Sequence, residues 1–535
     1  MAASVILFVS LMSLPFLVPH TGALALIGIV PLLCMERIAT LEGMKRVWIW
    51  HYTAFVLWNA VTTFWVCNAT VGGGIFAVLA NAFQMSLVFG IFRWSKKTLN
   101  GALPYILLAM LWTAWEKYYL TAAQISWPWL VLGNAFARTT SLAQWYEFTG
   151  TLGGSVWIWA CNLSVFGLLT ALSDGSWNRF NAKAKAASAG GCLLVFSAPM
   201  VLSMLMYSSY SETSDPVETV ILQPDIDPYS KFQSMPQAQQ NIILLDQLSS
   251  ALIERKDSSS ALLAVAPETF TGDIVTGDYE ASPTWRRFRS FLSGYPGVNL
   301  LFGASSHSYI DAPEAPSATA RKVGEDRWRE SHNSALIMDG SGETQIYHKS
   351  KLVVAVEMTP YPKFFCKIDD LLGGVMGRCV GQKEVSLLNC VRRNSTGITE
   401  TIPVGCAVCY ESVYPEHCAE YVRKGAEILT VITNDAWWGD TPGYRQHFSY
   451  ARLRAIETRR DIIRSANTGI SGIIDQKGDV VTESGWWEPD VIRSHANLNS
   501  RMTYFVQYGD VAGRLCVFFS FFLLLATAVR AYIRK

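Results

Sequence analysis

The chain has 535 residues, of which 50% are hydrophobic and only 16% are charged, against about 25% charged residues in an ordinary soluble protein. Asp, Glu, Lys and Arg number 16 in residues 1–210 and 71 in the remaining 325, which indicates a membrane part followed by a soluble part. This composition excludes a wholly soluble enzyme, a disordered chain and a small disulfide-stapled domain. The formal net charge of +1 gives no reason to expect a nucleic-acid partner.

The first part is predicted to cross a membrane seven times, and an eighth span is predicted near the C-terminus. A hydrocarbon core about 30 Å thick needs roughly 20 apolar residues per helix. The first 35 residues are apolar but are interrupted by Pro15, Pro19 and Gly22, so we expect two short helices in a hairpin. Charge-free runs predict the other spans at residues 49–66, 74–92, 98–115, 156–172, 189–207 and 515–529.

Basic residues predict the orientation of these spans. Three connections, within residues 37–46, 93–97 and 179–185, carry three Lys or Arg each, and the C-terminal tail adds three more. Because basic loops stay in the cytoplasm, we expect both termini there and residues 210–510 on the opposite side, which is the periplasm in a bacterium. The expected division is a transmembrane domain at 1–209, a catalytic domain at 210–510 and a last span at 511–535.

The connection between residues 121 and 155 is rich in Trp, Phe and Leu. One interpretation is an aromatic belt at the membrane interface. The other is a loop that lies along the membrane and helps to shape an entrance for a lipid.

The soluble part alternates short apolar runs with helical segments, which predicts an α/β layered domain. The polar stretch from residue 311 to 331 is interpreted as a mobile surface loop. Strands are predicted at 217–222, 262–266, 299–302, 334–338, 344–347, 402–408 and 428–432. Helices are predicted at 235–254, 284–293, 415–424 and 444–460.

Cys409 is the most informative of the eleven cysteines. It closes the apolar run 402–408 and precedes a turn, a setting that exposes a nucleophile and frees backbone N–H groups for an oxyanion. Cys406 and Cys409 form a Cys-x-x-Cys pair, but no second pair or suitably spaced histidines accompany it, so a zinc site is not expected.

A thiol needs a base, and two other predicted strands end in charged residues. Glu268 follows the strand at 262–266, and Lys349 follows the strand at 344–347. If these strands are neighbours in one sheet, Glu268, Lys349 and Cys409 converge at one edge. No histidine stands out as a base for Cys409, which argues against a Cys-His protease.

Five short blocks of this part resemble the nitrilase superfamily. The blocks are Pro267-Glu268, Tyr347-x-Lys349 followed by Glu357, Cys409-Tyr410-Glu411, Asn434-Asp435-Ala436-Trp437-Trp438-Gly439-Asp440, and Gln446-His447 followed by Arg452 and Glu457. Set between leading spans and a trailing span, they are similar to the apolipoprotein N-acyltransferase family, the membrane-bound branch of that superfamily. The resemblance implies an eight-span α-helical membrane domain joined to a nitrilase-like αββα sandwich.

Two stretches depart from the family pattern. The family usually reads Leu-Val-Pro-Phe-Gly-Glu where this chain has Leu352-Val353-Val354-Ala355-Val356-Glu357, so we expect a different loop path before Glu357. A Lys-Trp pair of the family appears here as Lys231-Phe232, which keeps an aromatic ring but loses the indole N–H.

The resemblance implies acyl transfer between two lipids in the bacterial inner membrane. Glu268 is implied as the proton acceptor, Lys349 as the oxyanion stabiliser and Cys409 as the nucleophile that carries the acyl group as a thioester. The donor is implied to be a phospholipid, phosphatidylethanolamine by resemblance, and the acceptor the α-amino group of the N-terminal diacylglyceryl-cysteine of a lipoprotein. No cofactor and no metal is expected. Supporting residues are implied at Glu357, Tyr410 and Glu411, and substrate contacts at Phe232 and Trp437.

Two other functions are compatible with the same residues. A membrane-tethered amidase or nitrile hydrolase would use the same three residues with water as acceptor, but a soluble substrate leaves the many spans unexplained. A non-enzymatic membrane scaffold with a relic nitrilase fold predicts that Cys409→Ala leaves function intact.

Overall fold

The computed structural model describes residues 1–253, 255, 261–371, 377–393 and 399–534, and these residues form two compact units. The first unit contains Met1–Ala123, Trp127–Tyr210 and Thr503–Lys535. The second contains Ser211–Met502 together with Gln124–Ser126, a short piece of the aromatic-rich connection.

The first unit is helical. A helix coincides with each predicted span, and short helices fill the turns between them. α4 packs between α1 and α6, α8 packs on α7 and α9, and α17 packs on α7. The helices at the expected spans are α1 (Ala2–Leu17), α2 (Ala25–Gly28) with α3 (Val30–Leu41), α4 (Val47–Thr63), α6 (Val71–Ser95), α7 (Leu103–Thr121), α8 (Tyr146–Ser173), α9 (Ala182–Ser209) and α17 (Val511–Ile533).

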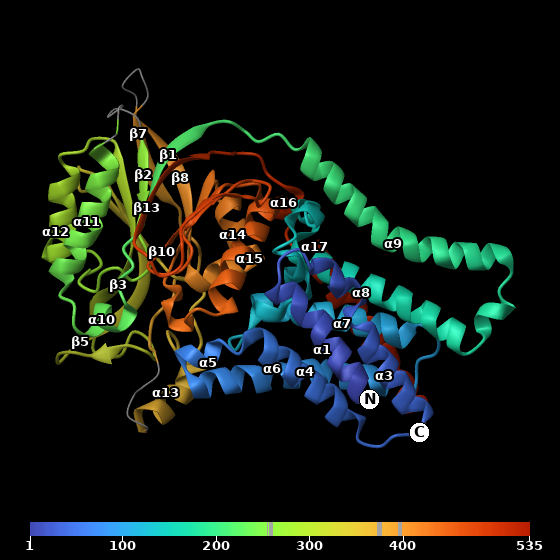
Figure 1. Cartoon of the computed structure of the whole chain (residues 1–535). Helices are drawn as coiled ribbons and strands as arrows, with labels where there is room; N and C mark the ends of the chain where they lie inside the picture. The colour runs from blue at the N-terminus through green and yellow to red at the C-terminus, as the bar shows by residue number, and fades with distance from the viewer. Residues whose placement is uncertain (254, 256–260, 372–376, 394–398, 535) are drawn as a thin grey trace. The chain divides into compact units, whose positions relative to one another are not determined.

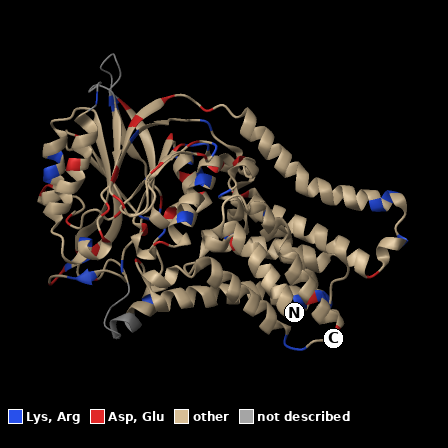
Figure 2. Ribbon diagram, viewed as in Figure 1, with Lys and Arg blue, Asp and Glu red and all other residues tan. Residues whose placement is uncertain are grey.

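Five helical segments in the described part of the chain are long and apolar enough to cross a membrane. Figure 2 shows these helices almost without charged residues, which lie mainly near helix ends. The membrane character of the first unit is thereby confirmed, whereas the count of eight spans stays a prediction. The five segments are Gly22–Leu41, Val71–Ser95, Tyr146–Ser173, Ala182–Ser209 and Val511–Ile533.

Charged residues of the first unit find partners near helix ends. Lys117 Nζ, at the end of α7, lies 3.0 Å from Asp510 Oδ2, just before α17, and this ion pair joins the last helix to the rest of the unit. Glu116 is buried and accepts a hydrogen bond of 2.8 Å from the backbone N–H of Leu132.

The second unit is built on two packed β-sheets (Figure 1). One sheet has the order β13-β1-β2-β3-β5-β4, with β6 paired to β5, and the other has the order β12-β11-β10-β9-β8-β7. The strands of the first sheet are β1 (Pro216–Gln223), β2 (Leu262–Val265), β3 (Val298–Asp311), β4 (Arg321–Lys322), β5 (Arg327–Met338), β6 (Thr344–His348) and β13 (Asp490–Asn497). Those of the second are β7 (Leu388–Arg393), β8 (Thr399–Val408), β9 (Ile428–Thr433), β10 (Ile462–Ala466), β11 (Gly472–Ile474) and β12 (Val480–Glu483).

Helices cover the outer face of each sheet, which confirms the predicted αββα sandwich. α11 (Gln237–Ile253) and α12 (Pro283–Leu292) lie on the first sheet, and α14 (Pro415–Arg423) and α15 (Pro442–Thr458) on the second (Figure 1). Leu244 of α11, Phe288 of α12 and Leu300 of β3 belong to one buried hydrophobic core and are fully buried. Burial of such side chains contributes about 1.5–3 kcal/mol each.

The prediction of a surface loop at residues 311–331 is wrong at its ends. β3 and β5 form a long antiparallel hairpin whose register runs from Leu300 opposite Met338 to Asp311 opposite Arg327. Its outer half is polar because both faces are partly exposed there, so the apolar runs alone marked only the buried half of each strand.

Candidate active site

The candidate nucleophile and its partners follow strands of both sheets. Glu268 lies just after β2, Lys349 directly follows β6, and Cys409 directly follows β8. The condition on which their convergence was predicted, that all three strands share one sheet, does not hold, because β2 and β6 belong to one sheet and β8 to the other. The three residues come together because the two sheets pack face to face.

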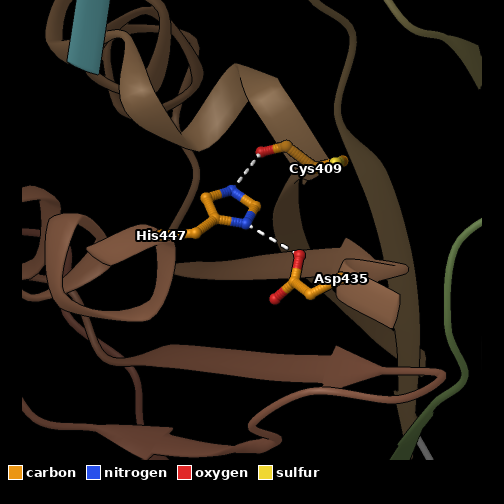
Figure 3. Close-up of side chains that lie close together, drawn as sticks. All are labelled: Cys409, Asp435 and His447. Atoms are coloured by element: carbon orange, nitrogen blue, oxygen red, sulfur yellow. Dashed lines mark hydrogen bonds and ion pairs between the residues drawn. The ribbon is translucent and has the colours of Figure 1, made fainter. Parts of the chain in front are cut away.

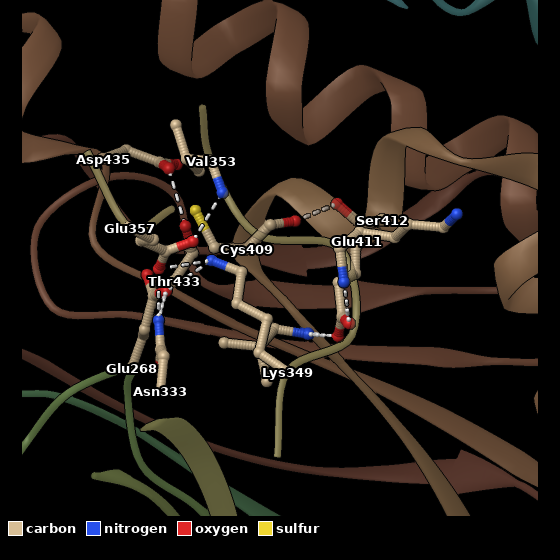
Figure 4. Close-up of polar contacts among 12 residues, drawn as sticks. Glu268, Asn333, Lys349, Val353, Glu357, Cys409, Glu411, Ser412, Thr433 and Asp435 are labelled. Carbon is tan, nitrogen blue, oxygen red and sulfur yellow. Dashed lines mark hydrogen bonds and ion pairs between the residues drawn. The ribbon is translucent and has the colours of Figure 1, made fainter. Parts of the chain in front are cut away.

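Lys349 lies between two carboxylates. Its Nζ is 3.1 Å from Glu268 Oε1 and 2.9 Å from Glu357 Oε1, and its side chain is fully buried (Figure 4). Burial alone would lower the pKa of Lys349, but the two carboxylates outweigh it and hold the pKa well above its ordinary value. Lys349 is therefore a fixed positive charge.

Asn333, on β5, is a fourth member of this cluster that the sequence did not reveal. Its Nδ2 donates hydrogen bonds of 2.7 Å to Glu268 Oε1 and 2.6 Å to Glu357 Oε1. Its backbone carbonyl also accepts a 2.8 Å hydrogen bond from Lys349 N–H. One amide group thus holds two carboxylates that would otherwise repel each other.

Cys409 has a left-handed backbone, with φ of 54°, and is partly exposed. Figure 4 shows the sulfur of Cys409 beside the ammonium group of Lys349. Burial raises the pKa of the Cys409 thiol well above its ordinary value, Glu268 raises it further, and Lys349 opposes the rise. The resting thiol is protonated, so it needs a base before it can attack.

The backbone of Glu268 is held on two sides. Lys231 Nζ donates a 3.2 Å hydrogen bond to the Glu268 carbonyl, and the next residue, Thr269, has φ of 47°. A Cβ at Gly303 would lie 2.5 Å from Glu268 Cα, so only glycine lets β3 approach this closely. Burial lowers the pKa of Lys231 to about 7, against an opposing effect of Glu268.

Glu357 reaches the cluster although its loop departs from the family pattern. Besides Lys349 and Asn333, it accepts a 2.7 Å hydrogen bond from Val353 N–H through Oε2. Ala355 adopts φ of 67°, a conformation that glycine takes at lower cost. The loop therefore holds the carboxylate in place with one non-glycine residue, Ala355, in a left-handed backbone conformation.

Glu411 braces the loops that carry Lys349 and Cys409. Its side chain is fully buried, and Oε1 accepts hydrogen bonds of 2.6 Å from Ser350 N–H and 3.0 Å from Lys351 N–H. Oε2 accepts a 2.8 Å bond from Val408 N–H. The Tyr347 hydroxyl donates a fourth bond, of 2.7 Å, and His417 Nε2 lies 3.2 Å away.

The side chain of Tyr410 contacts the short segment Gln124–Ser126. Its hydroxyl donates a 3.1 Å hydrogen bond to the Ser126 carbonyl, and the Ser126 hydroxyl lies 2.8 Å from that of Tyr414. Gln124 Oε1 accepts a 2.8 Å hydrogen bond from Tyr361 N–H. Part of the aromatic-rich connection thus contacts residues that flank Cys409 and Glu357.

Phe232 and Trp437, predicted separately, lie together. Phe232, on α10 (Pro228–Gln233), is 54% exposed and stacks on Trp437 with ring centroids 6.1 Å apart. The ring of Tyr229 packs edge-on against the ring of Trp437, with ring centroids 5.6 Å apart. Phe232 directly follows Lys231, whose ammonium group contacts the backbone of Glu268, so this aromatic surface begins close to the charged cluster.

Cys409, Asp435 and His447 have donor atoms within 4.8 Å of one another, a spacing compatible with a metal ion. In the structure these groups face protein partners. His447 Nε2 is 3.0 Å from the Cys409 carbonyl oxygen, and Nδ1 is 3.0 Å from Asp435 Oδ1 (Figure 3). His447 thus contacts the backbone carbonyl group of the nucleophile.

The chain is similar to known proteins over nearly its whole length. The family model for the apolipoprotein N-acyltransferase N-terminal domain matches residues 10–164, and that for carbon-nitrogen hydrolase matches residues 309–503. The apolipoprotein N-acyltransferase of Chlorobaculum tepidum is 27% identical over 96% of this chain and 93% of the relative, and that of Geobacter metallireducens is 25% identical over 95% and 91%. Among solved structures, Saccharomyces cerevisiae Nit3, of the nitrilase superfamily, is 14% identical over 54% of this chain and 93% of its own, with a TM-score of 0.36.

Proposed function

Since the chain belongs to the apolipoprotein N-acyltransferase family, we propose that it moves a fatty acyl chain from a phospholipid to a lipoprotein through a thioester on Cys409. The acceptor is the α-amino group of an N-terminal diacylglyceryl-cysteine, and the donor is phosphatidylethanolamine. The observation that carries this proposal is the cluster in which Glu268, Lys349 and Cys409 meet. Metal and cofactor have no part in the proposed reaction.

The first half-reaction forms the acyl-enzyme. Glu268 takes the thiol proton of Cys409, and the thiolate attacks the ester carbonyl carbon of the phospholipid. Lys349 and the backbone N–H of Tyr410 stabilise the resulting oxyanion, an effect worth about 3 kcal/mol per donor. The tetrahedral intermediate then expels the lysophospholipid alkoxide, which takes the proton back from Glu268.

The second half-reaction transfers the acyl group. The neutral α-amino group of the lipoprotein attacks the thioester carbonyl, and the same two donors stabilise the oxyanion. Glu268 takes the proton that the nitrogen loses, the Cys409 thiolate leaves, and the thiol is restored by that proton. The lysophospholipid leaves before the amine attacks the acyl-enzyme, so the reaction is ping-pong.

Supporting residues keep this geometry. Glu357 and Asn333 orient Lys349 and Glu268, and Glu411 ties the loop after Lys349 to the strand before Cys409. Phe232, which is exposed, and the partly exposed Trp437 offer an aromatic surface for an acyl chain or a diacylglyceryl group. The apolar helices anchor the enzyme where both substrates reside.

We place the enzyme in a bacterial inner membrane, with both termini in the cytoplasm and residues 210–510 in the periplasm. The distribution of basic residues between the expected spans supports this orientation. A cysteine-accessibility map of the loops tests it, because only periplasmic positions react with a membrane-impermeant reagent in intact cells.

Intact-protein mass spectrometry after incubation with phospholipid tests the chemistry. Wild-type protein is expected to gain the mass of one fatty acyl group, and Cys409→Ala is expected to gain none. Release of free fatty acid at the same rate with and without a lipopeptide acceptor would instead indicate hydrolysis.

A further inference from the structure

The carbonyl group of Cys409 is held by two side chains. The Ser412 hydroxyl donates a 2.8 Å hydrogen bond to it, and His447 Nε2 approaches the same oxygen at 3.0 Å (Figure 3). The Ser412 oxygen and His447 Nε2 are also 3.0 Å apart. His447 Nε2 therefore faces two oxygens, and it reaches them as an N–H donor.

The other side of His447 is fixed by a buried ion pair. Nδ1 lies 3.0 Å from Asp435 Oδ1 and 3.1 Å from Arg464 Nη2, and the Thr433 hydroxyl donates a 2.8 Å hydrogen bond to Asp435 Oδ1. Arg464 Nη2 donates a 2.6 Å bond to Asp435 Oδ2. Burial would raise the pKa of Asp435, but Arg464 and His447 outweigh it and lower the pKa, so the carboxylate stays ionised. The imidazole is thus locked in one orientation.

The peptide bond that carries the Cys409 carbonyl also carries the N–H of Tyr410. The peptide unit is planar, so fixing the direction of the C=O fixes the direction of the N–H at its other end. Hydrogen bonds to a carbonyl oxygen polarise the amide and strengthen its N–H as a donor, by about 10–30% per bond. In the proposed reaction this same N–H stabilises the oxyanion.

We propose that His447 and Ser412 are positioning residues that act on the oxyanion through the Cys409–Tyr410 peptide. They hold this peptide in the left-handed turn and polarise it, so that the Tyr410 N–H donates more strongly to the oxyanion. The inference rests on the proposed function, because it assigns the Tyr410 N–H to the oxyanion site. It also gives a role to the buried His447–Asp435 pair, whose imidazole lies 3.0 Å from the carbonyl oxygen of the nucleophile.

Two reactions of Cys409 separate this role from an effect on the thiol. Acylation by 4-nitrophenyl butyrate passes through an oxyanion, whereas alkylation by iodoacetamide forms a C–S bond, expels iodide and develops no oxyanion. Both need the thiolate. In the full-length protein, His447→Phe is expected to slow the burst of 4-nitrophenol release about 10-fold, which is less than the loss of a whole oxyanion donor would cost. The rate of Cys409 alkylation, measured from the mass of the modified peptide, is expected to change less than about 2-fold.

Further variants keep the test decisive if His447→Phe fails to fold. Ser412→Ala removes the second donor and is expected to show the same selective loss of acylation. His447→Gln retains an N–H donor and is expected to recover acylation to within about 3-fold of wild type. Ser449→Ala is the matched control, because this buried hydroxyl on α15 donates to the carbonyl of Gln446 and, among the described residues, makes no hydrogen bond to the Cys409–Tyr410 peptide.

Equal losses in acylation and alkylation for His447→Phe and Ser412→Ala would overturn the inference, as would unchanged acylation in both. The phospholipid reaction is measured separately. A wild-type protein that reacts with the nitrophenyl ester but gains no acyl mass from phospholipid would contradict the proposed function and leave the peptide test valid.

Discussion

Replacing Glu411 by Gln is expected to destabilise the catalytic domain and to slow formation of the acyl-enzyme. The buried carboxylate accepts hydrogen bonds from Ser350 N–H and Lys351 N–H on one oxygen and from Val408 N–H on the other. A Gln amide can present its oxygen to only one side. With the oxygen toward Ser350 and Lys351, its NH₂ group faces the N–H of Val408, donor against donor.

The expected cost follows from these contacts. A buried N–H left without an acceptor costs about 2 kcal/mol, and loss of charge assistance in the remaining bonds adds about 1 kcal/mol. Glu411→Gln is therefore expected to lower the free energy of unfolding by about 3 kcal/mol, measured by urea titration in detergent. Glu416→Gln is the control, because its ion pair with Arg423 is partly exposed and worth less than about 1 kcal/mol.

The kinetic effect distinguishes two roles for Glu411. If Glu411 only holds the two loops together, it fixes the position of Lys349 relative to Cys409. A displacement of either residue by about 1 Å costs on the order of 100-fold in rate. Single-turnover acylation is expected to slow by about that factor, while transfer from acyl-enzyme already formed slows in parallel. Normal acylation with a selective loss of transfer to the amine would refute the brace and indicate that Glu411 positions the incoming amine.

Three further changes test other parts of the site. Asn333→Leu leaves Glu268 and Glu357 without their shared donor and is expected to slow acylation at least about 10-fold in the nitrophenyl ester burst; an unchanged burst would contradict its role. Because burial lowers the pKa of Lys231 from 10.5 to about 7, the folded chain binds fewer protons than the unfolded chain between pH 7 and pH 10.5. The contribution of Lys231 to the free energy of unfolding therefore rises with pH in this range. The Tm of wild type minus that of Lys231→Met is therefore expected to increase from pH 7 to pH 9, and a decrease would refute the sign. Phe232→Ala is expected to raise the KM for phospholipid about 10-fold with kcat changed less than about 2-fold, whereas a fall in kcat alone would place Phe232 in the chemistry.

Most of the fold could be predicted from two features of the sequence, the distribution of charged residues and the positions where apolar runs end. Charge-free runs marked a helix at each expected span, because a lipid-facing helix shows its apolar character along its whole length. Apolar runs likewise marked β1, β2 and β6, whose residues are mainly buried or partly buried. The outer half of the β3–β5 hairpin was not predicted, because its strands are polar and show no run of apolar residues in the sequence.

The contacts of the site depended on tertiary structure that sequence patterns do not contain. Glu268, Lys349 and Cys409 were identifiable because each follows a strand and belongs to a block that resembles a family. Their convergence across two sheets was not foreseeable, since strand order in a sandwich is not encoded locally. Asn333 gave no signal, because its place on β5 opposite Lys349 comes from strand pairing alone.

The most direct test of the account is transfer from an isolated acyl-enzyme. Protein acylated on Cys409 by phospholipid is separated from free lipid and mixed with a synthetic peptide that begins with diacylglyceryl-cysteine. The account predicts that the fatty acyl mass leaves the protein and reappears as an amide on the peptide, with no transfer to a peptide whose α-amino group is acetylated. An acyl-enzyme that releases free fatty acid to water at the same rate with either peptide would contradict it.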